Sequence, residues 1–186
     1  KATLADLRFL KAQGWDIDVK AHARRGGAVL GLCGGYQMLG HCVRDPHGIE
    51  GTAGAEAGLG LLDVVTELAG AKTTETVTAR ALDLSLEVEG YEIHVGRTSA
   101  GDQAVEWLRR DGRAIGHRSQ DGKICGGYLH GLFADDGFRR GYLGRLGLAT
   151  ADDLSANARL QASLDELAAA METHLNIDGL LVAAGL

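Results

Sequence analysis

The chain has 186 residues, of which 45% are hydrophobic and 24% are charged, and 25 acidic against 19 basic residues give a net charge of −6. This composition excludes a disordered chain, a coiled coil and a disulfide scaffold, and it predicts a soluble globular protein. The negative charge disfavours binding to nucleic-acid phosphates, and no apolar run is long enough to span a membrane.

The first forty residues alternate between helical and strand-like segments. Leucines at three-residue spacing predict a helix over 4–13, which Gly14 ends. Residues 15–25 are predicted to form a short strand or turn followed by a helix, and the apolar run 28–32 a buried parallel strand. A glycine-rich turn and a helix over 36–41 follow. This alternation favours an α/β fold.

The middle of the chain is predicted to be rich in strands, and its end to be helical. Short β-branched or apolar stretches predict strands over 59–68, 73–79, 84–89, 91–95, 104–108, 114–118 and 127–129. A short helix is expected over 138–146. From Ser155 onward, apolar residues at spacings of three and four predict the clearest helix of the chain.

Together these segments predict an α/β fold in which helices flank a mostly parallel central sheet, with a helical C-terminal tail. We expect a single domain over 1–186, with a core over about 1–147 and a tail over about 148–186. Because the chain begins at Lys1 and not at methionine, we also expect it to be a fragment of a longer protein.

The cysteine pattern favours a reducing compartment. Cys33, Cys42 and Cys125 cannot all pair, and no C-x-x-C motif is present. The sequence therefore predicts neither a zinc site nor a thioredoxin-like site. The first residues do not have the pattern of a signal peptide. We expect a cytoplasmic protein without a bound metal.

The strongest chemical motif lies between the predicted strand and helix, in the segment GLCGGYQM. It has the pattern of a nucleophile elbow, G-x-nucleophile-x-G, with Cys33 between Gly31 and Gly35. Bulky neighbours would clash in such a turn, and the helix N-terminus favours the thiolate form of the cysteine. The backbone N–H of Gly34 would serve as one oxyanion donor. The alternative interpretation is a buried, unreactive cysteine.

A cysteine nucleophile needs a base, and His130 is the first candidate among seven histidines. It directly follows the short predicted strand 127–129. Strand ends that share an edge with the elbow are where such sheets bind ligands. His94, in GYEIHVGRT, is the second candidate.

The sequence contains no nucleotide-binding loop. The segment GLGLLD begins like a dinucleotide fingerprint but has Asp63 where the third glycine belongs, and no Walker-type phosphate loop is present. If the reaction needs ATP, the nucleotide is expected to bind elsewhere.

Together with the segments around His94 and His130, the elbow resembles the C-terminal glutaminase domain of the cobyric acid synthase family, a class I glutamine amidotransferase. The matching segments occur in the expected order and cover nearly the whole chain. They read TLADLRFLKAQGWD, GLCGGYQMLG, DPHGIEG, GLGLLDV, GYEIHVGRT and YLHGLF.

The resemblance implies that the chain hydrolyses the side-chain amide of glutamine through a cysteine thioester and passes ammonia to a synthetase domain of the same protein. There, ATP and Mg²⁺ would drive the amidation of corrin-ring carboxylates in cobalamin biosynthesis, and no cofactor is expected in this chain. By position, Cys33 is the nucleophile, His130 the general base and acid, and Gly34 an oxyanion donor. The candidates for binding the ends of glutamine are Tyr91, Glu92 and Arg97.

Two departures from the family pattern affect the site. Leu132 stands where class I enzymes usually have a glutamate, a loss that the corrinoid branch shares. The groups that could instead orient His130 are Glu92, Asp135, Asp136 or a backbone carbonyl. The opening strands, and the turn that supplies the second oxyanion donor, are expected before Lys1.

Three alternative functions stay open. The glutaminase domains of a cobyrinic acid a,c-diamide synthase or of a cell-wall isoglutaminyl synthase would use the same Cys33 chemistry with another acceptor. A non-catalytic structural or regulatory module would keep the fold with an unreactive Cys33. Leu132 favours this last alternative, and the intact elbow and His130 disfavour it.

Overall fold

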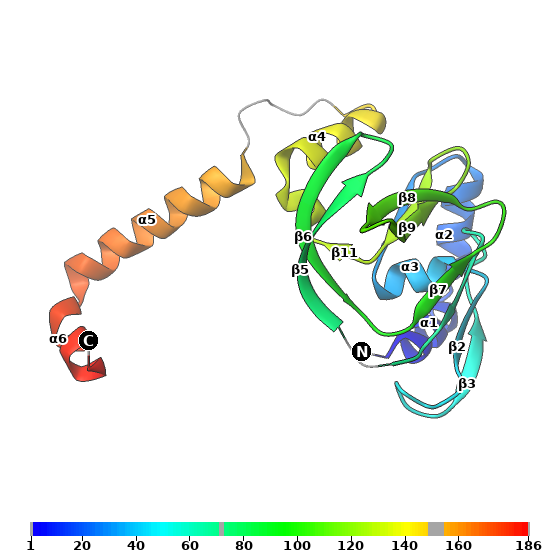
Figure 1. Ribbon diagram of the computed structural model, residues 1–186, viewed down its shortest axis with the longest axis horizontal. Helices are drawn as coiled ribbons and strands as arrows, with labels where there is room; N and C mark the ends of the chain where they lie inside the picture. Colours follow the sequence, from blue (N-terminus) through cyan, green and yellow to red (C-terminus); the bar gives the residue numbers. More distant parts are fainter. Residues whose placement is uncertain (1, 71–72, 149–154, 186) are drawn as a thin grey trace. The chain divides into compact units, whose positions relative to one another are not determined.

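The computed structural model describes residues 2–70, 73–148 and 155–185 (Figure 1). The chain divides into two compact units, Lys1–Phe133 and Ala134–Leu186. Within the described residues, the first unit contains both β-sheets and the helices α1–α3, and the second contains α4–α6. The single-domain organisation that the sequence suggests stays a prediction.

Two helices open the first unit, α1 (Thr3–Ala12) and α2 (Trp15–Arg24). The helix predicted over 4–13 is confirmed as α1. The segment 15–25 is helical from Trp15 onward, and no strand precedes its helix. The cause is Gly14, whose φ of 75° ends α1 and lets the chain begin α2 at the next residue.

The described strands form two sheets, and α3 (Gly34–Leu39) packs against both of them. The first sheet has the order β1-β10-β9-β8-β5-β6-β11. Its strands are β1 (Val29–Leu32), β5 (Thr73–Ala81), β6 (Leu86–His94), β8 (Val105–Arg110), β9 (Arg113–Arg118), β10 (Ile124–Gly127) and β11 (Leu129–His130). The second sheet has the order β3-β2-β4-β7. Its strands are β2 (Cys42–Asp45), β3 (Gly54–Ala57), β4 (Val64–Glu67) and β7 (Arg97–Ala100).

The α/β class, the flanking helices and the helical C-terminal tail are confirmed, but the sheets are mixed and not mostly parallel. Among the described strands, β1 runs parallel to β10 and β2 to β4, and the other paired strands are antiparallel. The reason is that β5–β6 and β8–β9 are hairpins, and a short turn can join antiparallel strands but not parallel ones.

Most of the predicted strands are present, with shifted boundaries. The two strands predicted over 84–89 and 91–95 are one continuous strand, β6, which passes through Gly90. The sequence does not predict β2, β3 or β7, because each has four residues and is rich in charged or small side chains. The helix predicted over 138–146 is confirmed as α4 (Asp136–Arg145).

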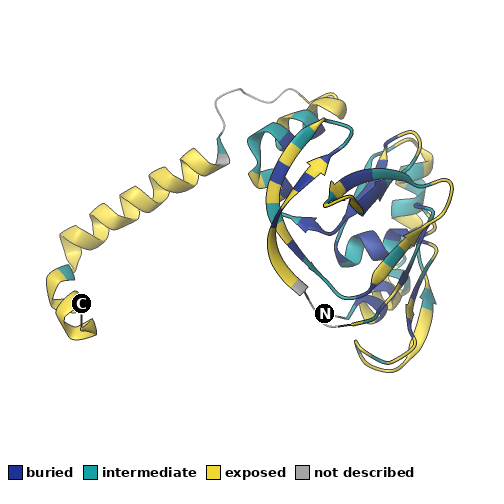
Figure 2. Ribbon diagram, viewed as in Figure 1, coloured by how far each residue is buried: buried dark blue, intermediate teal, exposed yellow. Residues whose placement is uncertain are grey.

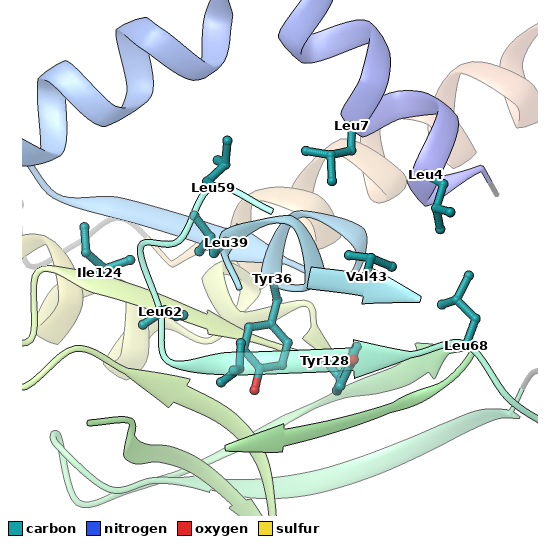
Figure 3. Close-up of a cluster of buried hydrophobic side chains, with 11 residues drawn as sticks. Leu4, Leu7, Tyr36, Leu39, Val43, Leu59, Leu62, Leu68, Ile124 and Tyr128 are labelled. Carbon is teal, nitrogen blue, oxygen red and sulfur yellow. The ribbon is translucent and has the colours of Figure 1, made fainter. Parts of the chain in front are cut away.

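One cluster of buried side chains joins α1, α3 and strands of both sheets (Figure 3). It contains Leu4 and Leu7 of α1, Tyr36 and Leu39 of α3, Val43 of β2, Val64 of β4 and Ile124 of β10. Burial of each such apolar side chain contributes about 1.5–3 kcal/mol. The cluster therefore fixes the helix that follows Cys33 firmly to the rest of the unit.

The described helices of the second unit are α4, α5 (Ala156–His174) and α6 (Ile177–Ala184). The Asp135 carboxylate caps α4 by accepting the Phe138 N–H at 2.7 Å, and the Ser155 hydroxyl caps α5 by accepting the Ala158 N–H at 3.2 Å. The helix predicted from Ser155 onward is confirmed as α5, and its leucines are exposed (Figure 2). In the described ranges, no helix is both long and apolar enough to cross a membrane.

Gly31 allows β1 to pass close to the first turn of α3. A Cβ atom at this position would lie 2.6 Å from the Cδ1 atom of Leu39 and 2.7 Å from the carbonyl carbon of Gly35. The second of these neighbours is helix backbone, which cannot rotate away as a side chain can. A Cβ atom on Gly35, in contrast, would meet nothing within 4 Å. The first glycine of the elbow is therefore required by packing.

We expect Gly31→Ala to lower the free energy of unfolding by about 1–3 kcal/mol, because the added methyl group forces β1 and α3 apart. Gly35→Ala is the matched control, since it adds the same group in open space within a helix and should change stability by less than about 1 kcal/mol. Denaturant unfolding followed by circular dichroism measures both. Wild-type stability of Gly31→Ala would contradict the packing argument.

Candidate active site

Cys33 lies in a strained turn between β1 and α3. Its φ of 53° and ψ of −110° are unusual for a residue other than glycine, and such a conformation costs about 1–3 kcal/mol. Two backbone hydrogen bonds hold the turn. The Cys33 N–H donates to the Gly127 carbonyl at 2.9 Å, and the Cys33 carbonyl accepts the Gln37 N–H at 3.2 Å. This strand-to-helix turn has the form of a nucleophile elbow.

The thiol of Cys33 contacts the edge of β6. Its Sγ atom donates to the Ile93 carbonyl at 3.1 Å. On this edge, β11 pairs with β6 through two residues, His130 opposite Tyr91 and Leu129 opposite Glu92. Ile93 is the next residue of β6, so Cys33 occupies the position just beyond the part that β11 covers.

His130 lies at the same edge of β6. Its partner Tyr91 is two residues before Ile93, and two residues of a strand span about 7 Å. The His130 ring stacks on the Tyr91 ring with centroids 4.9 Å apart and planes 9° apart. Its Nε2 atom is buried and has no hydrogen-bond partner among the described residues. The structure thus brings the predicted nucleophile and the predicted base to one edge, with a ring nitrogen available for proton transfer.

Glu92 and His94 lie on the other face of β6 from Tyr91, because side chains alternate along a strand. His130 shares its face with Tyr91, as their stacking shows. Glu92 therefore does not face His130, and nor does His94, the second candidate base. The His94 ring instead stacks on Tyr128 with centroids 3.8 Å apart.

Glu92 is only 2% exposed, and two arginines bind its carboxylate. Arg110 donates to it at 3.0 Å, and Arg113 donates to both of its oxygens at 3.1 Å. Arg110 also pairs with Glu75 at 2.6 Å. Hydrogen bonds to Glu75 and Glu92 raise the pKa of Arg110, so its guanidinium stays charged throughout the physiological range.

These charged groups line a cavity of about 770 Å³ in the first unit. Arg97 and Glu92 both line it, whereas Tyr91 stacks on His130. Of the three candidates for binding the ends of glutamine, the structure therefore brings two to one cavity and places the third beside the predicted base. Their roles stay predictions.

The acidic candidates of the second unit for orienting His130 have partners of their own. The Asp135 carboxylate accepts the Phe138 N–H, and Asp136 pairs with Arg139 at 2.6 Å. Leu132 is buried and supplies no carboxylate. Among the described residues, no group of three or more histidine, cysteine or acidic side chains is arranged to hold a metal ion.

The three cysteines have different surroundings, although none of them forms a disulfide. Burial raises the pKa of the Cys125 thiol to about 12, and its Sγ atom donates to the Gly122 carbonyl at 3.4 Å. Cys125 is therefore neutral and unreactive near pH 7. Cys42 lies on β2, in the second sheet. Of the three, Cys33 is the one that lies in the elbow.

A buried hydrogen-bond network fixes α3 behind Cys33. Gln37 is fully buried, and its Nε2 atom donates to the Val95 carbonyl at 3.0 Å and to the Tyr128 hydroxyl at 3.2 Å. The Tyr128 hydroxyl also contacts the Thr98 hydroxyl at 2.5 Å. Burial raises the pKa of Tyr128, so the phenol keeps its proton and its donor capacity.

Sequence reasoning assigns no role to Gln37, Tyr128, Arg110 or Arg113. The first lies within the elbow segment, and its fixed position after the nucleophile is a signal that could have been used. The two arginines flank the turn of the β8–β9 hairpin and have the pattern of ordinary surface charges. Their pairing with Glu92 is a contact between distant segments, for which the sequence carries no local signal.

Solved structures show the class of fold. The chain superposes on a protein described as "Crystal structure of glutamine amidotransferase" with a TM-score of 0.57 and 17% identity, over 78% of this chain and 75% of that chain. A second match is "Structure of PurLQS from Thermotoga maritima", with a TM-score of 0.52 and 17% identity over 70% and 68% of the two chains. The fold is that of a glutamine amidotransferase.

The chain belongs to the CobB/CobQ-like glutamine amidotransferase domain family, whose model matches residues 1–138. Its sequence is 53% identical over 184 residues to the cobyric acid synthase of Ruegeria sp. (strain TM1040). It is 51% identical to that of Cereibacter sphaeroides and 50% identical to that of Bradyrhizobium diazoefficiens. Each match covers 99% of this chain but 38% of the relative, so the chain spans about two fifths of their length.

We expect Tyr128→Phe to lower the free energy of unfolding by about 1–3 kcal/mol, because the buried Gln37 amide and Thr98 hydroxyl both lose a partner. Tyr91→Phe is the control, since it removes the same hydroxyl from a side chain that is 44% exposed. It should change stability by less than about 0.5 kcal/mol. Equal denaturant midpoints for the two variants would show that the network adds nothing to stability.

Proposed function

We propose that this chain is the glutaminase domain of a cobyric acid synthase. The observation that carries the proposal is the strained Cys33, whose thiol lies on the same edge of β6 as His130. Two comparisons support this assignment. The chain belongs to the CobB/CobQ-like glutamine amidotransferase family, and about half of its residues are identical to those of cobyric acid synthases over nearly its whole length.

The reaction begins with proton transfer from the Cys33 thiol to the His130 ring. The thiolate attacks the side-chain carbonyl carbon of glutamine, and a carbon–sulfur bond forms while the carbonyl π electrons move to the oxygen. The tetrahedral intermediate collapses, the carbon–nitrogen bond breaks, and His130 returns the proton to the departing nitrogen. Ammonia leaves, and a γ-glutamyl thioester remains on Cys33.

Water completes the cycle. His130 takes a proton from a water molecule, and the resulting hydroxide attacks the thioester carbonyl. The carbon–sulfur bond breaks, glutamate leaves, and the proton on His130 returns to the Cys33 sulfur. The Gly34 N–H, at the first position of α3, is the proposed donor to the oxyanion in both steps.

The acceptor of the ammonia is proposed to lie outside this chain. In this proposal, the ATP-dependent synthetase part of the same protein uses the ammonia to amidate carboxylates of a corrin ring in cobalamin biosynthesis. ATP and Mg²⁺ bind to that part, and the protein works in the cytoplasm. The identity to cobyric acid synthases favours this acceptor over those of a cobyrinic acid a,c-diamide synthase or a cell-wall isoglutaminyl synthase.

One observation favours a second candidate, a non-catalytic amidotransferase-like module. Leu132 is buried where a carboxylate would orient the histidine, and its side chain cannot accept a hydrogen bond. A module of this kind would keep the fold and have no reactive thiol. The two candidates differ in the reactivity of Cys33 toward a glutamine analogue.

We expect a glutamine-like diazoketone to label Cys33 selectively in the full-length protein, and excess glutamine to suppress the labelling. The reason is that this reagent alkylates a thiolate held in a glutamine pocket. Peptide mass spectrometry identifies the modified residue, and Cys125 is the internal control because its raised pKa keeps it neutral. Equal, glutamine-insensitive labelling of Cys33 and Cys42 would support the non-catalytic module.

We expect Cys33→Ala and His130→Asn to abolish glutamine-dependent amidation in the full-length protein and to spare amidation with added ammonium salt. Both substitutions remove the glutaminase step and leave the acceptor site intact. Removal of such a group typically lowers turnover by about 10⁴-fold or more. Assays with each nitrogen source measure the two activities. A variant that keeps glutamine-dependent turnover would show that its residue has been assigned the wrong role.

A further inference from the structure

Two anchored side chains flank the residue that accepts the Cys33 hydrogen bond. Glu92 precedes Ile93, and Arg110 and Arg113 hold its carboxylate through three hydrogen bonds of 3.0 to 3.1 Å. This carboxylate is buried, and both arginines come from the β8–β9 hairpin. The side chain before Ile93 is therefore fixed to another part of the same sheet.

His94 follows Ile93 and is anchored as well. Its ring stacks on Tyr128 with planes 15° apart, and its Nδ1 atom lies 3.4 Å from the Glu92 carboxylate. The Tyr128 hydroxyl is in turn held by Gln37 of α3. The two side chains that flank Ile93 thus support one another and connect to the helix that follows Cys33.

The position of the Ile93 carbonyl follows from this arrangement. Glu92 and His94 lie on the face of β6 that lines the cavity, and the carbonyl between them accepts from the Cys33 thiol at the strand edge. Neither side chain need touch the sulfur to affect it. Fixing the residues before and after Ile93 fixes the direction of the carbonyl.

We propose that Glu92 is a positioning residue for the nucleophile. The hydrogen bonds from Arg110 and Arg113 to its carboxylate hold the Ile93 carbonyl in the position where this carbonyl accepts the Cys33 thiol proton in the free enzyme. The inference rests on the proposed glutaminase function. It assigns Glu92 a role that differs from contact with glutamine. The thiol stays aligned on this carbonyl until the substrate enters and His130 takes the proton.

The inference predicts that Glu92→Gln slows the turnover of glutamine but speeds the alkylation of Cys33. Turnover of glutamine falls about ten- to a hundredfold, because the sulfur is no longer aligned for attack. Alkylation of Cys33 by iodoacetamide becomes about three- to tenfold faster at pH 7, because the sulfur is no longer held against the Ile93 carbonyl by its hydrogen bond. The KM for glutamine stays the same, since Glu92 does not touch the substrate.

The matched control is Glu75→Gln. Glu75 lies opposite Glu92 in the β5–β6 pair, carries the same charge and binds the same Arg110. If the charge alone mattered, both substitutions would have similar effects. The inference predicts that Glu75→Gln leaves turnover and alkylation near the wild-type values, because Glu75 does not adjoin Ile93.

The experiment uses the full-length protein and measures glutamine turnover and the alkylation rate of each cysteine by mass spectrometry. Faster labelling of Cys33 with slow labelling of Cys125 supports the inference, whereas faster labelling of both reports unfolding. In that case Arg113→Gln tests the same hydrogen bonds with less risk of unfolding, because the Arg113 side chain is 55% exposed and Arg110 still binds Glu92. A second failure to fold would make Glu92 a structural residue and overturn the inference.

Two other results also decide the question. A raised KM with unchanged alkylation would place Glu92 in contact with glutamine and overturn the positioning role. Wild-type behaviour of Glu92→Gln in an enzyme with glutaminase activity would overturn the inference alone. A wild-type protein without glutaminase activity would overturn the proposed function itself, so the two failures are distinguishable.

Discussion

The candidate site depends on the short stretch of the β6 edge that β11 leaves uncovered. β11 pairs with two residues of β6, and the next carbonyl, that of Ile93, accepts the Cys33 thiol instead of a backbone N–H. The absence of a side chain at Gly90 permits this arrangement, because a Cβ atom there would lie 2.1 Å from the His130 carbonyl oxygen. One strand edge thereby sets the positions of both the nucleophile and the base.

The strain at Cys33 is tolerated because its neighbours are firmly packed. A backbone conformation of this kind costs about 1–3 kcal/mol and persists where the surroundings determine it. Tyr36 and Leu39 of α3 belong to the buried cluster, and Gln37 is held by hydrogen bonds to Val95 and Tyr128. Burial of two large side chains on one short helix more than offsets the cost of the turn. The fold therefore keeps the cysteine in a position that the local sequence alone would not favour.

Local features of the site are visible in the sequence, and long-range features are not. The spacing of two glycines about Cys33 specifies the elbow, since strand, turn and helix follow one another between Val29 and Leu39. The position of His130 follows from its place after a short strand. Gln37 and Tyr128, in contrast, are 91 residues apart, and Glu92 and Arg113 are 21 apart.

The strand directions illustrate the same limit. The apolar run 28–32 predicts a buried parallel strand, and β1 indeed pairs in parallel with β10. Hairpins then continue the sheet in the antiparallel sense, which an apolar or β-branched stretch of residues does not reveal. Predicting the arginines around Glu92 would have required knowing that the β8–β9 hairpin lies near β6.

The buried charge of Glu92 is better explained by geometry than by stability. A carboxylate that is 2% exposed has lost most of its hydration, and the attraction of nearby arginines does little more than offset that loss. Water further weakens the contribution of Arg113, whose side chain is 55% exposed. An apolar residue could fill the same space in an equally stable protein. It would not, however, form directional hydrogen bonds with two guanidinium groups. The arginines restrict the β6 backbone at the residue before Ile93, and the alignment of the Cys33 thiol is where that restriction has a chemical consequence.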